Sequence, residues 1–253
     1  MRALLISGGS VDDGFILNYI GQESYDVVFA VDRGLDFFAR NGLRPDYIVG
    51  DFDSVEDSVL EQYWPGEVRT SMQGSRTEMG ESAAQERRPI IVKLNPEKDD
   101  TDTGHAIQMA LDLGCDSIHV FGATGTRLDH VLGNLQLLGL ALRRQTECFL
   151  IDPWNRIRLI DRETVLRKDT QFGAYVSLIP YTPQVTGLTL TGFKYPLERH
   201  TMGSFYLADA SPISGVSNEI AEEEAKITFD GGILVLVESR ELDNKERLNG
   251  YQL

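Results

Sequence analysis

The sequence predicts an α/β N-terminal domain with a mostly parallel sheet flanked by helices, followed by an antiparallel β-sandwich C-terminal domain. Three observations predict this fold class. Up to about Asp152, apolar runs of strand length alternate with helical spacing, which is typical of a parallel sheet covered by helices. Beyond Asp152, short apolar runs are separated by prolines and glycines, which is typical of antiparallel strands. A chain of 253 residues has room for two modest domains, and we expect them at 1–152 and 153–253.

The first predicted domain contains six apolar runs of strand length. They lie at residues 3–7, 27–31, 47–49, 90–94, 118–121 and 148–151. Apolar residues at helical spacing predict one helix through Ile107, Ala110 and Leu111, and another from Val131 to Leu142. Residues 66–89 lack this periodicity and are rich in polar residues, which indicates a flexible surface insertion. The alternative is a lid that brings an arginine to a phosphate.

The second predicted domain contains short strands with turn residues between them. The expected strands are residues 156–160, 174–179, 185–190, 226–229 and 233–237. Pro180, Pro183, Gly187 and Gly192 are among the residues that separate them, and such residues favour tight connections between antiparallel strands. This pattern predicts a sandwich.

Composition narrows the possible functions. The chain has 24 basic and 39 acidic residues and a net charge of −15, which disfavours nucleic acid and anionic membranes as partners. Cys115 and Cys148 are far apart and form no Cys-x-x-Cys motif, so we expect neither a disulfide scaffold nor a thiolate zinc site. The apolar run near Met1 is too short for a signal peptide, and we find no membrane-spanning segment. We therefore expect a cytoplasmic protein.

Acidic clusters follow three of the predicted strands. They lie at residues 50–54, 99–102 and 125–130. In an open parallel sheet, ligands collect beyond the carboxyl ends of the strands, where helix N-termini also point. Carboxylate oxygens are hard ligands that suit Mg²⁺. The clusters therefore predict an enzyme that holds Mg²⁺ on a nucleoside triphosphate.

The first two clusters supply the candidate metal ligands. If the chain stays extended after residue 50, Asp51 and Asp53 project to one side while Phe52 anchors the turn in the core. In the second cluster we favour Asp102 as a ligand over Asp100. The alternative for the second cluster is a helix N-cap, in which the Asp and Thr side chains satisfy the first N–H groups of the helix and one acid would suffice. Lys98 is placed to relieve the clustered negative charge or to contact a phosphate.

The third cluster combines a glycine turn, a guanidinium and a carboxylate. Arg127 can make bidentate contacts with a phosphate; its alternative role is a salt bridge with Asp129. Asp32 and Gly34, after the second strand, add a further acid and a turn at the same edge. The glycines fit neither a Walker loop nor a dinucleotide fingerprint, so those two families are disfavoured.

Taken together, these clusters resemble the thiamine pyrophosphokinase family. The resemblance continues at residues 191–198, Thr-Gly-Phe-Lys-Tyr-Pro-Leu-Glu, and 215–219, Gly-Val-Ser-Asn-Glu, and covers nearly the whole chain. It implies transfer of a diphosphoryl group from ATP to the hydroxyl of thiamine, giving thiamine diphosphate and AMP. It also implies a homodimer in which thiamine lies in a cleft completed by the sandwich domain of the other subunit.

The resemblance also implies residue roles. Asp51, Asp53 and Asp102 match metal and phosphate carboxylates, and Asp32 and Asp129 match further acidic site residues. The ATP-binding set is Asp32, Gly34, Lys98, Asp100, Thr101 and Arg127, and the thiamine-binding set is Asp129, Asn134, Ser217 and Asn218. The catalytic set is Asp51, Asp53, Asp102, Arg127 and Asp129. From its residue types alone, the Ser217-Asn218 pair is equally typical of a turn between strands.

Two other functions stay open at this point. A nucleotidyl or glycosyl transferase also uses Asp-x-Asp to hold a metal on a nucleotide. A non-catalytic thiamine or nucleotide sensor would keep the fold without turnover, although clustered acids add little to pure binding.

Overall fold

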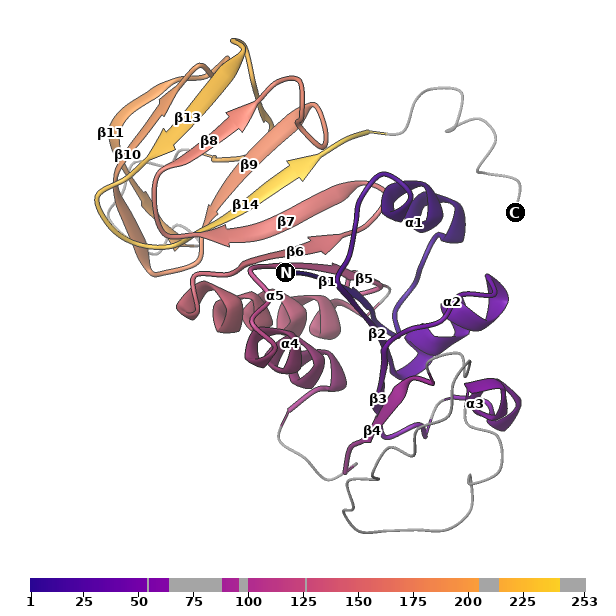
Figure 1. The fold of residues 1–253 in the computed structure, drawn as a ribbon. Coiled ribbons are helices and arrows are strands. Elements are labelled where there is room, and N and C mark those ends of the chain that lie inside the picture. Colours follow the sequence, from indigo (N-terminus) through magenta and orange to yellow (C-terminus); the bar gives the residue numbers. More distant parts are fainter. Residues whose placement is uncertain (54, 64–87, 96–99, 126, 205–213, 242–253) are drawn as a thin grey trace. The chain divides into compact units, whose positions relative to one another are not determined.

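The structure is a computed structural model that describes residues 1–53, 55–63, 88–95, 100–125, 127–204 and 214–241 (Figure 1). It contains two compact units, Met1–Asn134 and Leu135–Leu253. Most of the predicted insertion at 66–89 lies outside the described residues, as does Lys98.

The first unit is built on five parallel strands. Their spatial order is β5 (Ser117–Phe121), β1 (Arg2–Ile6), β2 (Val27–Val31), β3 (Tyr47–Gly50) and β4 (Ile90–Lys93). Every neighbouring pair among them is parallel, as predicted. Their carboxyl ends therefore lie at one edge, which is where the acidic clusters follow the strands.

Helices cover both sides of these strands (Figure 1). The helices are α1 (Asp13–Ile20), the 3-10 turn η1 (Asp32–Gly34), α2 (Leu35–Arg40), α3 (Asp57–Tyr63), α4 (Asp102–Asp112) and α5 (Leu128–Arg143), which continues into the second unit. α4 packs against β1, β2 and β3 and buries Ile107, Ala110 and Leu111, which confirms the helix predicted there. α1 packs against β5 through Tyr19 and Phe121, whose ring centroids are 5.3 Å apart.

The second unit contains two antiparallel sheets. In one, the order is β12 (Asn218–Glu219), β9 (Tyr175–Pro180), β14 (Leu234–Ser239), β7 (Asn155–Ile160) and β6 (Glu147–Ile151). In the other, the order is β11 (Leu197–Gly203), β10 (Gln184–Thr191), β13 (Glu224–Thr228) and β8 (Thr164–Arg167). Both sheets contribute buried side chains, such as Leu178, Leu236, Leu188 and Ile227, to a single hydrophobic cluster. The predicted sandwich is therefore confirmed.

Two details differ from the sequence-based expectation. β6, expected in the parallel sheet, belongs to the same ten-stranded sheet as those strands, but within the second unit its pairing with β7 is antiparallel. Its apolar run is buried at four successive positions, so periodicity cannot reveal the direction of its partner. β8, β11 and the two-residue β12 were not predicted, because β11 is mostly polar and the others are very short. The domain boundary at Pro153 stays a prediction.

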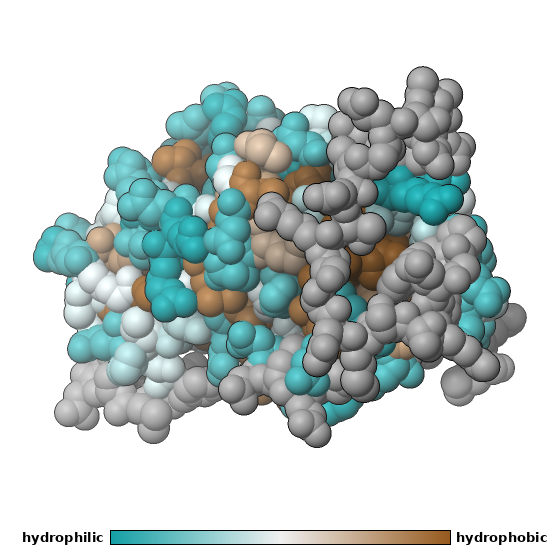
Figure 2. Space-filling model, turned by 60° about the horizontal axis from the view of Figure 1, so that its bottom comes forward, coloured by the Kyte–Doolittle hydropathy of each residue, from teal (hydrophilic) through white to brown (hydrophobic). Residues whose placement is uncertain are grey.

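The surface of the described residues mixes polar and apolar side chains. On the face shown in Figure 2, hydrophobic residues lie among hydrophilic ones. Within the ranges that the structure describes, we find no helix with both the length and the apolar character needed to cross a membrane.

Candidate active site

Three carboxylates converge at the carboxyl edge of the parallel strands. One oxygen each from Asp32, Asp51 and Asp102 lies within 4.8 Å of the other two, and all three residues are half-buried. They follow β2, follow β3 and begin α4, respectively. Three hard oxygen donors at this spacing suit a divalent cation such as Mg²⁺.

Glycines allow Asp32 to reach this group. Asp32 has a φ of 49°, in the left-handed region, where it begins η1. A Cβ atom on Gly34 would lie 1.9 Å from the carbonyl oxygen of Ile6, so only glycine lets η1 pack against the end of β1. A Cβ atom on Gly50 would lie 3.3 Å from the Asp32 Cα. The position of Asp32 therefore depends on the close packing that Gly34 in η1 and Gly50 at the end of β3 allow.

Asp53 is not a member of the three-carboxylate group. The expected alternation of Asp51 and Asp53 requires an extended chain, but Phe52 has a φ of 64°, so the chain turns there. The exposed Asp53 instead donates its backbone N–H to Asp51 Oδ1 at 3.2 Å. This bond makes a local turn that holds the Asp51 carboxylate.

The second cluster combines a helix cap with a candidate ligand. Thr101 Oγ1 accepts a hydrogen bond from the Gly104 backbone N–H at 3.1 Å, so Thr101 is the N-cap of α4. Asp102 is the first helical residue and lies in the carboxylate group, whereas Asp100 is exposed. The N-cap considered as the alternative is therefore formed by Thr101, and the next residue, Asp102, belongs to the carboxylate group.

In the third cluster, Arg127 and Asp129 form an ion pair. Arg127 donates from Nε and Nη2 to the two Asp129 oxygens at 3.2 and 2.6 Å. Both side chains are well exposed, at 69% and 64%. The hydrogen bond from Arg127 is the main cause that lowers the pKa of Asp129 to about 2. The salt bridge that we considered as the alternative role of Arg127 is thus formed.

A cleft of about 580 Å³ in the first unit is lined by Asp32 and Asp102 of the carboxylate group and by the Arg127–Asp129 ion pair. Its walls are the glycine turns after β1 and β5, η1, the start of α4 and the first turns of α5. The predicted site residues that line it are Asp32, Thr101, Asp102, Arg127, Asp129 and Asn134. Gly9 donates its N–H to the Gly122 carbonyl at 2.9 Å, and Asn134 Nδ2 donates to the Ala123 carbonyl at 2.7 Å. These bonds hold the glycine turns in place beside the cleft.

The remaining predicted residues, Ser217 and Asn218, lie in the second unit. Asn218 Oδ1 accepts the Tyr195 N–H at 3.0 Å and its Nδ2 donates to the Tyr195 carbonyl at 2.9 Å. Ser217 has a φ of 60° and donates its N–H to Ser177 Oγ at 3.1 Å. Asn218 and Tyr195 line a small, mainly apolar hollow of about 90 Å³.

Tyr195 is the residue that our sequence analysis did not single out. Its side chain is 60% exposed at the hollow, and Lys194 Nζ lies 5.7 Å from the ring centroid. Lys194 also pairs with Glu219 at 2.6 Å. The sequence feature that could have identified Tyr195 is its place within the 191–198 motif.

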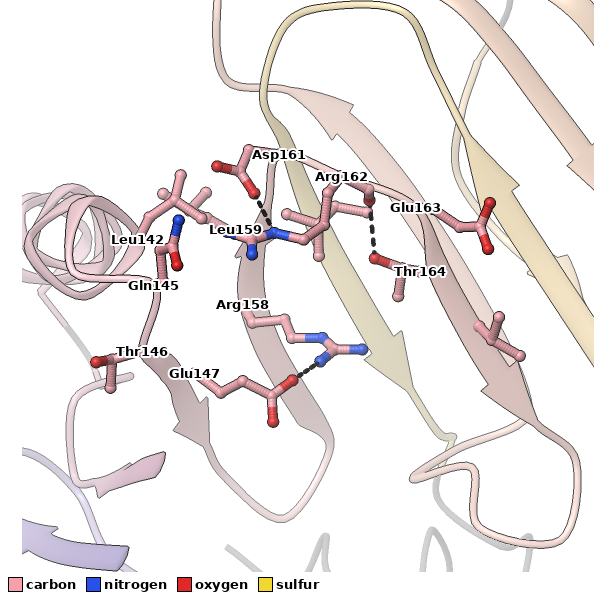
Figure 3. Close-up of a pocket in the computed structure, with 12 residues that line it drawn as sticks. Leu142, Gln145, Thr146, Glu147, Arg158, Leu159, Asp161, Arg162, Glu163 and Thr164 are labelled. Atoms are coloured by element: carbon pink, nitrogen blue, oxygen red, sulfur yellow. Dashed lines mark hydrogen bonds and ion pairs between the residues drawn. The ribbon is translucent and has the colours of Figure 1, made fainter. Parts of the chain in front are cut away.

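A second cavity, of about 320 Å³, lies between the end of α5, β6, β7 and β8 (Figure 3). None of the predicted site residues lines it. Arg158 pairs with Glu147 at 2.6 Å, and Arg162 pairs with Asp161 at 2.8 Å. Burial lowers the pKa of Arg158, which the nearby Glu147 partly offsets. The arginines of this cavity are thus neutralised by its own carboxylates.

The fold and the site together define a two-unit protein class in which an α/β unit with an acidic, glycine-walled cleft is joined to a β-sandwich, and the comparisons with known proteins identify that class as phosphotransferases. The chain belongs to the thiamine pyrophosphokinase family. The family model "Thiamin pyrophosphokinase, catalytic domain" matches residues 21–150, and "Thiamin pyrophosphokinase, vitamin B1 binding domain" matches residues 163–234.

Individual relatives agree with this assignment. Thiamine pyrophosphokinase of Bacillus subtilis is 32% identical over 220 residues, which cover 86% of this chain and 89% of that protein. A crystal structure of the Bacillus subtilis enzyme covers 96% of this chain and 100% of its own, with a TM-score of 0.75 and 28% identity. That of Geobacillus thermodenitrificans thiamin pyrophosphokinase covers 97% and 100%, with a TM-score of 0.74 and 28% identity.

Proposed function

We propose that this chain transfers the diphosphoryl group of ATP to the primary hydroxyl of thiamine, giving thiamine diphosphate and AMP. The observation that carries the proposal is the convergence of Asp32, Asp51 and Asp102 beside the glycine-walled cleft, in a chain of this family. The thiamine oxygen forms a bond to the β-phosphorus, and the bond from that phosphorus to the oxygen bridging to the α-phosphorus breaks. AMP leaves with the bridging oxygen, and the hydroxyl proton passes to solvent.

Mg²⁺ fits the carboxylate group. Three carboxylate oxygens within 4.8 Å of one another are the hard ligands that Mg²⁺ prefers, and substrate phosphates and water would supply its remaining ligands. When bound, Mg²⁺ offsets the negative charge that develops on the phosphate oxygens. Our initial ligand set was Asp51, Asp53 and Asp102; the geometry favours Asp32 in place of Asp53. We assign Asp53 the role of orienting Asp51 through its backbone N–H.

The nucleotide is proposed to lie in the cleft of the first unit. The backbone N–H groups of the glycine turns and the start of α4 favour phosphate oxygens there. Arg127 is exposed at the rim and supplies positive charge. We infer that Gly34 serves the site by letting η1 pack closely against β1, because it is buried and has no room for a Cβ atom there. Roles for Lys98, Asp100 and Thr101 in ATP binding stay predictions.

Asp129 is better suited to electrostatic interaction than to accepting a proton. A carboxylate whose pKa is about 2 binds protons weakly near neutral pH, so Asp129 is a poor general base. We propose instead that it orients Arg127 and, with Asn134, attracts the positive thiazolium ring of thiamine. Positioning and charge neutralisation then supply most of the rate enhancement.

Thiamine recognition is assigned to the hollow of the second unit. Both polar atoms of the Asn218 amide bond to the backbone of Tyr195, so Asn218 holds that residue at the hollow. The left-handed conformation of Ser217 fixes the approach of the chain to this point. The match of residues 163–234 to a vitamin B1 binding domain supports this assignment.

We also propose a homodimer and a cytoplasmic location. The homodimer is supported by the family assignment, and the location by a chain with only two cysteines, which are too few for a disulfide scaffold.

The test is product analysis. The chain is incubated with ATP, Mg²⁺ and thiamine, and the products are identified by mass spectrometry. We expect thiamine diphosphate and AMP in equal amounts, with neither formed when thiamine or Mg²⁺ is omitted. Pyrophosphate release or sugar transfer would support the rival transferases. Tight thiamine binding without product would support a sensor.

A further inference from the structure

A buried pair of hydroxyl groups lies behind the three carboxylates. Ser7 Oγ and Thr103 Oγ1 are 2.6 Å apart, and the two residues are only 7% and 6% exposed. Ser7 follows β1, and Thr103 is the second residue of α4, next to Asp102. Both residues also line the cleft. None of our predicted site roles includes either residue.

Ser7 is held by the surrounding backbone. Its N–H donates to the Phe121 carbonyl at 2.8 Å, which joins the ends of β1 and β5. A Cβ atom on Gly122 would lie 2.4 Å from the Ser7 carbonyl oxygen, so the backbone segments at Ser7 and Gly122 are in close contact. The Ser7 hydroxyl is therefore attached to a part of the sheet edge that has little freedom to move.

The hydroxyl bond connects this rigid edge to the first turn of α4. Thr101 caps the helix from within its own chain segment, whereas the Ser7–Thr103 bond joins the helix to a strand 96 residues away in sequence. In a hydroxyl pair one oxygen donates and the other accepts, so removing either one leaves a buried polar group without that partner. The first turn of α4 would then relax relative to β1.

We propose that Ser7 and Thr103 are positioning residues that hold the Asp102 carboxylate at the distance from Asp32 and Asp51 needed to bind a divalent cation. The inference rests on the proposed function, since it assigns a task to the proposed metal site. If one of the three carboxylates shifts by about 1 Å, the distances between their oxygens no longer match those that a divalent ion requires.

The experiment measures Mn²⁺ binding, without turnover, by electron paramagnetic resonance in the presence of α,β-methylene ATP, which cannot be cleaved at the reacting bond. Thr103→Val keeps the shape and removes the hydroxyl, and Thr103→Ser keeps the hydroxyl. We expect Thr103→Val to raise the Mn²⁺ dissociation constant about 5-fold, and Thr103→Ser to stay within about 2-fold of the unmodified chain. When EDTA removes the metal, both variants should bind α,β-methylene ATP as tightly as the unmodified chain does.

Two further variants distinguish a pair from independent effects. If the hydroxyls act together, Ser7→Ala raises the dissociation constant as Thr103→Val does, and the double variant is no weaker than either single one. Tyr63→Phe is the matched control, because it removes the Tyr63 Oη bond to the Leu43 carbonyl, 2.8 Å long, in the same unit but outside the cleft. We expect Tyr63→Phe to leave Mn²⁺ binding unchanged.

The outcomes separate the two proposals. If the unmodified chain binds Mn²⁺ and Thr103→Val binds it equally well, the positioning role is wrong while the metal site stands. If effects of the two hydroxyls add, or if Thr103→Ser is as weak as Thr103→Val, the pair is also rejected. If the unmodified chain binds no Mn²⁺, the proposed metal site fails, and the positioning role fails with it. Near-ultraviolet circular dichroism checks that each variant is folded, and Thr103→Ser provides a folded comparison.

Discussion

At the scale of single residues, the ion pair with Arg127 sets the protonation behaviour of Asp129. Asp129 and Arg127 are both exposed, so their ion pair adds little to stability. Its main consequence is that Asp129 stays ionised to a pH of about 2. Since this pKa lies below the ordinary value of 3.8, the pair stabilises the folded state above about pH 3.8, and that contribution is lost as the pH falls toward 2.

Arg127→Gln tests this electrostatic assignment. Without the guanidinium, we expect the pKa of Asp129 to rise from about 2 toward 3.8. Carboxyl ¹³C chemical shifts followed from pH 1.5 to 6 would measure it, with Arg144→Gln as a control that removes a charge elsewhere on the chain. An Asp129 that still titrates near pH 2 in the variant would contradict the assigned cause.

Asp102→Asn tests the metal role of a single carboxylate. The amide keeps the shape and can still occupy the first position of α4, but it lacks the charge that binds Mg²⁺. We expect the rate of thiamine diphosphate formation to fall by at least about 100-fold while the circular dichroism spectrum is unchanged. Asp112→Asn, at the other end of the same helix, should keep normal activity. An Asp102→Asn enzyme within about 3-fold of normal would refute the role.

At the scale of helices and strands, glycines allow the segments that carry the site to touch. The close approach of Gly34 to β1 and of Gly9 to Gly122 leaves no room for a Cβ atom. Such contacts bring the ends of separate strands together, so that carboxylates from η1, from the residue after β3 and from α4 lie within 4.8 Å of one another.

Gly34→Ala is expected to disrupt this packing. The φ of Gly34 is −56°, which alanine adopts without strain. Any loss of stability would therefore come from the clash between the added Cβ atom and the Ile6 carbonyl oxygen, which would be 1.9 Å apart. We expect a loss of about 1–3 kcal/mol in the free energy of unfolding, measured in urea. Gly14→Ala, in α1, where the added Cβ atom would meet Asp12 Oδ1 at an ordinary contact distance of 3.5 Å, should be neutral or stabilising. Equal stability of the two variants would show that η1 does not pack as described.

The sequence allowed most elements to be predicted, and some of the site. The apolar spacing of Ile107 and Ala110 predicted α4, and acids after successive strands predicted that Asp51 and Asp102 would meet. Local pattern could not predict that Asp32, rather than Asp53, lies beside Asp51 and Asp102. This arrangement depends on the left-handed turn at Phe52 and on glycine contacts between strands that are distant in sequence.

The limits for strands have a similar physical origin. β11 lies at the edge of its sheet and carries mostly polar residues, so it lacks the alternation that reveals half-buried strands. β6 has the apolar signature of a buried strand, but its antiparallel pairing depends on β7, which a local pattern does not describe. Local pattern therefore identifies the interior of a sheet better than its edges and directions.

At the scale of the whole molecule, the two proposed binding sites lie in different compact units. The carboxylates and the glycine-walled cleft belong to the first unit, and the Asn218–Tyr195 hollow belongs to the second. Transfer requires that thiamine and the triphosphate meet, and a homodimer would supply the sandwich of one subunit to the nucleotide site of the other.

Sedimentation combined with activity tests the dimer. We expect a mass of about twice the 28.2 kDa of one chain at the concentrations used for assays. Mixing an Asp102→Asn chain with an Asn218→Ala chain should restore part of the activity that each lacks alone, because one composite site in the mixed dimer would be intact. A monomer with full activity would contradict the shared cleft.

The most direct measurement is a crystal structure of the chain with Mg²⁺ and α,β-methylene ATP. The account predicts one Mg²⁺ between Asp32, Asp51 and Asp102, bound also to phosphate oxygens of the analogue, with Asp53 outside its coordination shell. A metal bound elsewhere, or a nucleotide bound far from these three carboxylates, would contradict it.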